Sequence, residues 1–287
     1  MNFVSKSSNF LLPAWLTKVK EECEKEALEE QRYEIKLFED EGRKMVWLIC
    51  LLLDVNKRGV PGHACKLVER YVFHQMELSR NFARGSEELR NFLHSFESQL
   101  VLIVTTCVNL SAKKFLSKPH LSINVICTRL QDIGFEHTDE EMSAMEFNIL
   151  KSFKVTLPLW TSVDVARLIA FAIGMSEPLL EQVELIMNLA ELRRNRINHE
   201  ARTKASLSTS PSRKYVNKTV RSLHLAGGVV LALMQYQNMH DMRRELELVK
   251  LTCAPYPCLK CLSLIVYKNV MQTIFIAPQS KKRTHDE

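Results

Sequence analysis

The chain has 287 residues, of which 46% are hydrophobic and 25% charged, and its formal net charge is +6 at pH 7. With only 8 glycines and 9 prolines, and with apolar residues recurring at helical spacing, the composition argues against an all-β fold and predicts a soluble all-α protein of one or two domains. The mild positive charge permits an acidic partner without requiring one.

The sequence shows no sign of secretion or membrane insertion. Residues 1–18 lack the continuous apolar core of a signal peptide, and the longest apolar run, residues 45–53, is far too short to cross a bilayer. We therefore expect a cytosolic or nuclear protein without a membrane partner. Its cysteines are expected to be reduced and mostly buried, although the spacing of Cys253, Cys258 and Cys261 leaves a zinc site open as a lesser alternative.

Motifs for catalysis are missing from the sequence. There is no Walker-type glycine loop, no GxGxxG, no HExxH and no nucleophile in a motif that would activate it. The sequence therefore predicts a protein that is not an enzyme and that uses no cofactor and no metal.

The first 41 residues are predicted to form a charged helical extension. Residues 1–12 are polar and are expected to be frayed, whereas residues 13–41 are dense in glutamate and lysine. A narrow apolar stripe in the second part includes Val19 and Cys23. This pattern predicts a solvated amphipathic helix that lies on the main body or faces a partner.

Two helices are predicted next, at residues 45–55 and 63–76. The first is apolar nearly throughout and should be buried, and a turn at residues 60–62 (VPG) separates the two. Apolar residues near the end of the stretch 77–98 indicate that the following helix starts early. We therefore expect an extended helix there rather than disorder.

The segment 99–161 contains three more predicted helices, and the first of them should be central to the fold. Apolar residues lie on nearly every side of this helix, so other helices are expected to enclose it. It ends in a basic and aromatic tip, Lys113-Lys114-Phe115.

The other two helices of this segment carry clear start signals. Ser122 is expected to cap a helix that ends near Gly134. Thr138 and Glu141 predict a capping box at the start of the next helix, in which Glu146 lies beside the apolar stripe.

Beyond residue 161 the pattern predicts a second helical domain over residues 162–276, followed by a polar tail at residues 277–287. Its helices are expected at residues 163–173, 179–192, 223–236, 240–252 and 258–276. Between the second and third of these, the basic, serine-rich stretch 193–221 is predicted to be an exposed loop.

Several of these motifs resemble the cyclin box. Residues 112–115 (AKKF) are similar to the end of a cyclin's third helix, and residues 145–150 (MEFNIL) and 157–161 (LPLWT) are similar to its fifth helix and exit. The resemblance covers roughly residues 43–161. It implies an all-α, cyclin-like fold in which one clear five-helix cyclin box, residues 42–161, precedes a divergent second helical box.

The resemblance also implies functional residues. In cyclins, the matching lysine and glutamate hydrogen-bond the main chain of a cyclin-dependent kinase, so Lys114, Phe115 and Glu146 are expected to bind such a kinase. The alternative is that Lys114 and Glu146 pair only with each other on the surface. Arg43 and Glu69 are expected to form an ion pair that joins the first two helices, unless they are simply surface charges.

Within the superfamily, the chain looks most similar to the cyclin N-terminal domain-containing proteins and to the crossover-site-associated cyclin-like proteins of meiosis. The lengthened link before the third helix and residues 133–138 (IGFEHT) carry this resemblance. It implies a nuclear, chromosome-associated protein that promotes crossover formation at meiotic recombination sites. The implied partners are a cyclin-dependent kinase and crossover factors of mismatch-repair type.

Two other functions stay open. One is an ordinary cyclin that activates a kinase in transcription or the cell cycle, although the substrate-docking patch of many cell-cycle cyclins is not legible at residues 43–47. The other is a DNA-binding cyclin-fold transcription factor that would use the basic stretch 193–221, although the zinc ribbon usual in that class is missing. Ser210 is a candidate phosphorylation site, and residues 281–283 (KKR) are a candidate nuclear-import signal.

Overall fold

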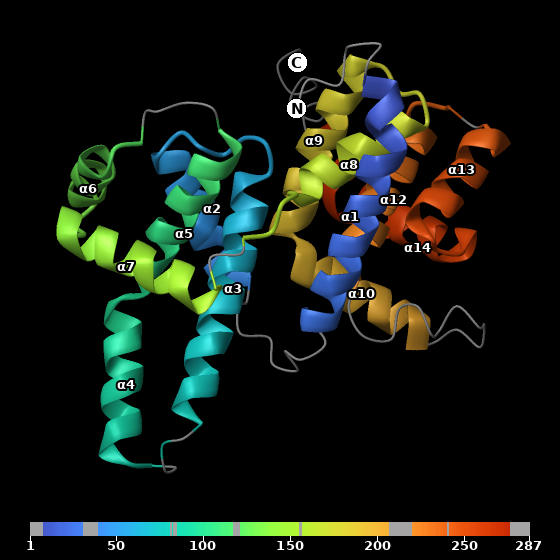
Figure 1. Ribbon diagram of the computed structural model, residues 1–287. Coiled ribbons are helices and arrows are strands. Elements are labelled where there is room, and N and C mark those ends of the chain that lie inside the picture. Colours follow the sequence, from blue (N-terminus) through green and yellow to red (C-terminus); the bar gives the residue numbers. More distant parts are fainter. Residues whose placement is uncertain are drawn as a thin grey trace, which may run out of the picture. The chain divides into compact units, whose positions relative to one another are not determined.

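The computed structural model describes residues 8–30, 40–80, 82, 85–116, 121–154, 157–206, 220–239 and 241–275. These residues are helical with no strand among them, which confirms the predicted all-α class (Figure 1). The chain divides into two compact units, which we name for their places in the sequence. The central unit is Ile35–Leu159, and the flanking unit combines Met1–Glu34 with Trp160–Glu287.

The central unit is built around one enclosed helix. Its elements are α2 (Asp40–Leu52), α3 (Val60–Ser79), α4 (Glu87–Ser98), α5 (Leu100–Phe115), α6 (Ile123–Gln131) and α7 (Asp139–Ser152). Every residue of α5 from Leu102 to Ala112 is buried, and the helix contacts α2, α3, α4 and α7. Because α5 is covered on nearly every side, its buried part carries no charged side chain, and the polar residues there are small or uncharged.

The helix starts in the central unit follow the local signals in the sequence. The Ser122 hydroxyl accepts a hydrogen bond from the Val125 amide at the start of α6. At the start of α7, Thr138 and Glu141 form both hydrogen bonds of the capping box. Both predicted caps are confirmed, because each depends on residues only three positions apart.

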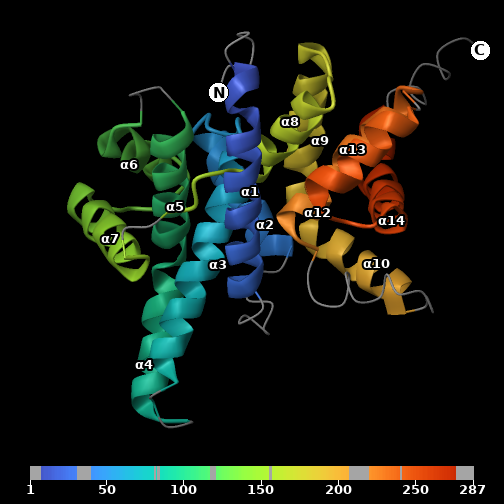
Figure 2. The same cartoon turned by 45° about the vertical axis from the view of Figure 1, so that its right-hand side comes forward.

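The expectation that the helix of residues 99–115 starts early, within the stretch 77–98, is wrong, although much of this stretch is helical, as expected. Instead, α3 ends at Ser79 and a separate helix, α4, begins after Ser86, whose hydroxyl accepts from the Leu89 amide. Gly85 adopts a left-handed φ of 79°, which suits a turn and not a continuing helix. Only Gln99 separates α4 from α5, and α4 has no buried residue. The end of α3 and α4 project together from the rest of the central unit (Figures 1 and 2).

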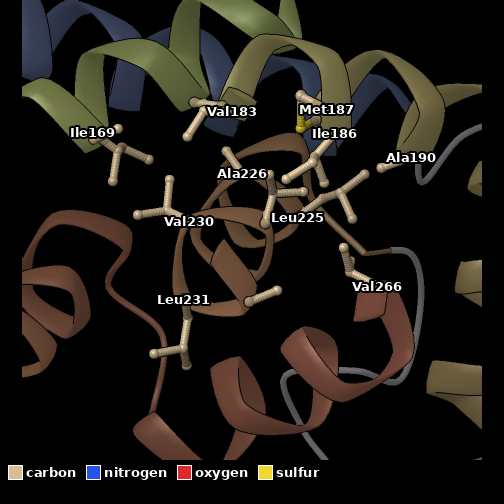
Figure 3. Packing of buried hydrophobic residues seen from close by; sticks show 14 of the residues in the cluster. Ile169, Val183, Ile186, Met187, Ala190, Leu225, Ala226, Val230, Leu231 and Val266 are labelled. Carbon is tan, nitrogen blue, oxygen red and sulfur yellow. The ribbon is translucent and has the colours of Figure 1, made fainter. Parts of the chain in front are cut away.

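The flanking unit is also built around one enclosed helix, α12 (Ser222–Tyr236). Its elements are α1 (Ser8–Glu30), α8 (Ser162–Ala172), α9 (Glu177–Leu192), α10 (Arg194–Ser206), α12 (Ser222–Tyr236), α13 (Met242–Thr252), α14 (Tyr256–Val266), the π-helical turn η1 (Tyr267–Met271) and α15 (Gln272–Phe275). Every residue of α12 from Ser222 to Met234 is buried. Its side chains, among them Ala226 and Val230, lie against α8 and α9 (Figure 3).

The N-terminal helix α1 belongs to the core of the flanking unit. Val19 and Cys23 are buried there, and the helix contacts α8 and α12. The expectation that residues 1–12 are frayed is wrong for residues 8–12, which belong to α1. Leu12 packs against this core, and its burial stabilises the start of α1. The sequence prediction overlooked this contact because it treated the whole segment as polar.

The predicted loop over residues 193–221 is also wrong in its first half. Residues Arg194–Ser206 form α10. Arg194 is buried and donates to the Glu191 carboxylate at 2.6 Å and to the Val220 carbonyl at 3.0 Å. The exposed loop was predicted from the positive charge of this stretch. That inference fails at Arg194, because this side chain lies in the packed interior. Ser210 and residues 281–283 lie outside the described residues.

Membrane and metal signals are sparse in the part of the chain that the structure describes. No single helix there is long and apolar enough to span a bilayer; the helices Met242–Thr252 and Tyr256–Ile274, bent by 98°, reach that criterion only as a pair. None of the eight cysteines forms a disulfide bond. Among the described residues, no group of three or more His, Cys, Asp or Glu side chains could hold a metal ion.

The close approach of α12 and α14 yields a stability prediction. A Cβ atom at Gly228 would lie 2.8 Å from the Leu262 Cβ, an atom that no side-chain rotation can move away. Alanine gains about 1 kcal/mol over glycine in helix propensity, whereas overpacking costs about 1–3 kcal/mol. We expect Gly228→Ala to lower the free energy of unfolding by about 1 kcal/mol in urea titrations. A variant as stable as the parent, or more stable, would contradict this packing.

Candidate partner-binding site

The last turn of α5 carries two lysines that make different contacts. Lys113 Nζ donates to both carboxylate oxygens of Glu146 on α7, at 2.8 and 2.7 Å. Lys114 Nζ donates to the Leu157 carbonyl at 3.1 Å and lies 5.7 Å from the centroid of the Phe115 ring. The tip of α5 is therefore tied both to α7 and to the segment that follows it.

The structure gathers the three predicted kinase-binding residues at one place, the tip of α5 and the adjoining face of α7. It does not form the alternative pair, since the salt bridge of Glu146 is with Lys113 and not with Lys114. Lys113 is the residue that sequence reasoning missed. Its position beside Lys114 in a two-lysine tip was the available signal, but sequence spacing alone does not say which amine faces α7.

A buried histidine supports the aromatic residue of the tip. The edge of the Phe115 ring meets the His63 ring, with centroids 4.7 Å apart and planes at 76°. His63 Nδ1 lies 2.8 Å from the Ser111 hydroxyl, which itself donates to the Cys107 carbonyl at 2.8 Å. Which of the two groups donates depends on which ring nitrogen of His63 carries the proton.

The surroundings of His63 keep it uncharged. Burial, followed by the positive charges of Lys66 and Lys114, lowers the pKa of His63 to about 3. A neutral imidazole adds no repulsion to the basic tip above it. His63 therefore acts as a fixed polar support that joins α3 to α5 and sets the position of Phe115. Sequence reasoning placed this residue at the start of a helix and gave it no role.

Arg43 and Glu69 connect the first two helices of the central unit. Arg43 on α2 is 3% exposed, and its guanidinium group donates to the Glu69 carboxylate on α3. A buried cation needs a partner of opposite charge, because leaving it alone in the interior is very costly. The pair therefore holds α2 against α3, one of the helices that enclose α5.

Large apolar side chains lie exposed in the same two motifs that supply Glu146 and Leu157. Phe147, the next residue along α7, is 66% exposed, and Leu159 is 60% exposed. Aromatic and apolar side chains left open beside charged groups are typical of sites that anchor a partner protein. Chemically, this surface offers ammonium, carboxylate and aromatic groups on well-packed helices, which suits recognition of a polypeptide.

The fold, an all-helical arrangement around an enclosed helix with a charged tip, is consistent with a cyclin-like architecture. Over 201 aligned residues the chain is 24% identical to human cyclin N-terminal domain-containing protein 1 and 25% identical to its mouse counterpart, with 63% of this chain covered in each case. The chain spans 61% and 60% of the lengths of these curated relatives. No family model matches the chain. The two relatives support assignment to a cyclin-like family.

The buried histidine gives a pH prediction with a defined sign. The pKa of His63 is about 3 in the folded state, so between pH 6.5 and 3 the unfolded chain binds a proton that the folded chain does not. Stability must therefore fall as the pH drops below 6.5. For this one group the loss from pH 7.5 to pH 5 is about 2 kcal/mol.

The variant His63→Asn isolates this contribution, because asparagine keeps an N–H donor toward Ser111 but does not titrate. Urea unfolding of both proteins at pH 7.5 and pH 5 should show a smaller pH-dependent loss in the variant, by about 2 kcal/mol. An identical loss in both proteins would mean that His63 is not held neutral in the folded state.

Proposed function

We propose that this chain is a non-catalytic, cyclin-like regulator that binds a cyclin-dependent kinase through the tip of α5 and the adjoining face of α7. The observation that carries the proposal is the co-location of Lys114, Phe115 and Glu146. These three residues come from two separate helices, and each makes a defined contact within the chain, with the Leu157 carbonyl, the His63 ring and Lys113 respectively.

The physical basis of such binding is the exchange of internal contacts for contacts to a partner. Without a partner, Lys114 donates to the Leu157 carbonyl oxygen and Glu146 pairs with Lys113. A kinase main chain offers the same kinds of group, carbonyl acceptors for the lysine and N–H donors for the carboxylate. The Lys113–Glu146 pair is partly exposed, with 45% and 19% of the side chains accessible, so opening it costs no more than about 1 kcal/mol.

The effect on the kinase would be a shift of population. A kinase whose regulatory helix is misplaced lacks the lysine–glutamate pair that its active state requires. A partner that binds the active arrangement more tightly stabilises that arrangement by the difference in its two affinities. A rigid binding surface favours this role, because a flexible one would adapt to both states alike.

We further propose that the protein acts in the nucleus, on chromosomes at meiotic recombination sites, and promotes crossover formation. Crossover factors of mismatch-repair type would be additional partners. The resemblance of residues 133–138 and the lengthened link before α5 support this proposal. The ordinary kinase-activating cyclin stays the alternative, and discrete chromosomal foci confined to meiotic germ cells would distinguish the two.

The DNA-binding alternative rests on fewer side chains than the sequence suggested. Arg194, counted in the basic stretch, is buried in an ion pair with Glu191. Arg196 lies 3.5 Å from the carboxylate of Glu200, which Lys268, outside this stretch, shares. Part of the positive charge of this stretch is therefore already balanced, which favours a protein partner over DNA.

The kinase proposal is tested by affinity purification of the tagged chain from its native tissue, followed by mass spectrometry. Glu146→Lys and Lys114→Glu should each abolish recovery of a cyclin-dependent kinase, because either change places a donor against the partner's N–H groups or an acceptor against its carbonyl groups. Glu140→Lys, an exposed reversal on the same helix, is the matched control and should recover the kinase. Lys113→Ala should change recovery by less than about fivefold.

Kinase recovery that persists in both single reversals and in the double reversal would refute the proposed site. Circular dichroism and urea unfolding of each variant should match the parent, since Glu146 and Lys114 lie at the surface of the packed core. These measurements separate loss of binding from loss of folding.

A further inference from the structure

A pocket of about 490 Å³ lies between α3 and α7 in the central unit, away from the three residues discussed above. Lys151, at the end of α7, and Lys154, just after it, line this pocket. No aspartate or glutamate lies among the described residues of its wall, and within the described residues neither lysine forms an ion pair. The pocket therefore contains two positive charges without a carboxylate partner.

The remaining wall is rich in hydrogen-bond donors. His74 and Gln75 come from α3, and Asn148 comes from α7 one turn before Lys151. Within the described residues, none of these three side chains is committed to a hydrogen bond. Each of them has an N–H group that can donate to an oxygen in the pocket.

An arginine beside the wall joins the two sides of the pocket. The Arg70 guanidinium lies 5.1 Å from the centroid of the Phe153 ring, over its face. Arg70 precedes His74 by one helical turn on α3, and Phe153 lies between the two pocket residues Ser152 and Lys154. The stacking connects α3 to the end of α7 and holds the two walls of the pocket together.

The C-terminal end of a helix normally repels an anion, because its last carbonyl oxygens carry partial negative charge. At the end of α7, internal hydrogen bonds occupy several of these oxygens. The Ile149 carbonyl accepts from the Phe153 amide at 3.2 Å and from the Ser152 hydroxyl at 2.7 Å. The Lys151 carbonyl accepts from the Lys154 amide at 3.1 Å. These bonds occupy carbonyl oxygens near the pocket, and the two lysines outweigh the half charge of the helix end.

We propose that this pocket binds a phosphate monoester, carried by a phosphorylated serine or threonine of a partner protein. A phosphate monoester carries close to two negative charges at neutral pH and has three acceptor oxygens, which matches two lysines and several neutral donors. A carboxylate, by comparison, carries only one negative charge. The volume exceeds that of a phosphate group alone and leaves room for the side chain that carries it and for its neighbours.

The proposal does not depend on kinase binding. Lys114, Phe115 and Glu146 do not line the pocket, so substitutions at either place can be tested without altering the other. Lys151, Lys154 and Asn148 are exposed, and replacing them leaves the core intact.

The test uses the full chain and fluorescein-labelled peptide pools with one central phosphoserine and degenerate flanks, measured by fluorescence anisotropy. Pools with serine or glutamate at the centre are the peptide controls. The phosphorylated pool should bind at least about tenfold more tightly than either. The double variant Lys151→Ala/Lys154→Ala should lose this preference, and Asn148→Asp, which adds a negative charge to the wall, should also weaken binding.

The matched protein control is Lys18→Ala/Lys250→Ala, which removes the same charge at exposed positions outside the pocket and should bind like the parent. Equal affinity for phosphorylated and unphosphorylated pools, or unchanged affinity in the pocket variants, would overturn the proposal. Inorganic phosphate that competes as strongly as the phosphopeptide would assign the pocket to the free ion instead. Tighter, pocket-dependent binding of a single-stranded oligonucleotide would assign it to nucleic acid.

Discussion

The central unit depends on enclosing α5, a helix that is buried on all sides over most of its length. Residues Leu102–Ala112 can be buried only if helices surround them, so α2, α3 and α7 are all fixed by the same requirement. Only the last turn of α5 emerges from this enclosure. Its side chains are therefore presented from a helix that cannot shift without disturbing the core, and this rigidity suits a recognition surface.

The polar groups around α5 strengthen the same arrangement. The Arg43–Glu69 pair joins α2 to α3, and the His63–Ser111 hydrogen bond joins α3 to α5 just beneath Phe115. A buried polar group that is matched by a partner favours one geometry over others. In the flanking unit, α12 is enclosed in the same way, and its glycines allow α14 to approach closely.

Local signals explain what the sequence predicted correctly. The caps at Ser122 and Thr138 involve residues within one turn, and the enclosed helices are visible in their unbroken apolar pattern. Two of the errors involve contacts between residues far apart in the sequence. Arg194 looked like a loop residue because its hydrogen bond to the Val220 carbonyl cannot be read from charge alone, and Lys113 was missed because spacing does not reveal which amine reaches α7. The pocket between α3 and α7 was invisible because its walls lie some seventy residues apart, as with Gln75 and Asn148.

The most direct test of the central claim is hydrogen–deuterium exchange of the full chain with and without the purified kinase that it recovers from tissue. Exchange reports protection of individual backbone segments when a partner covers them. If the kinase binds at the proposed site, exchange should slow in the exposed last turn of α5 and in α7 around Glu146 and Phe147. Protection confined to other segments, with these two unchanged, would contradict it.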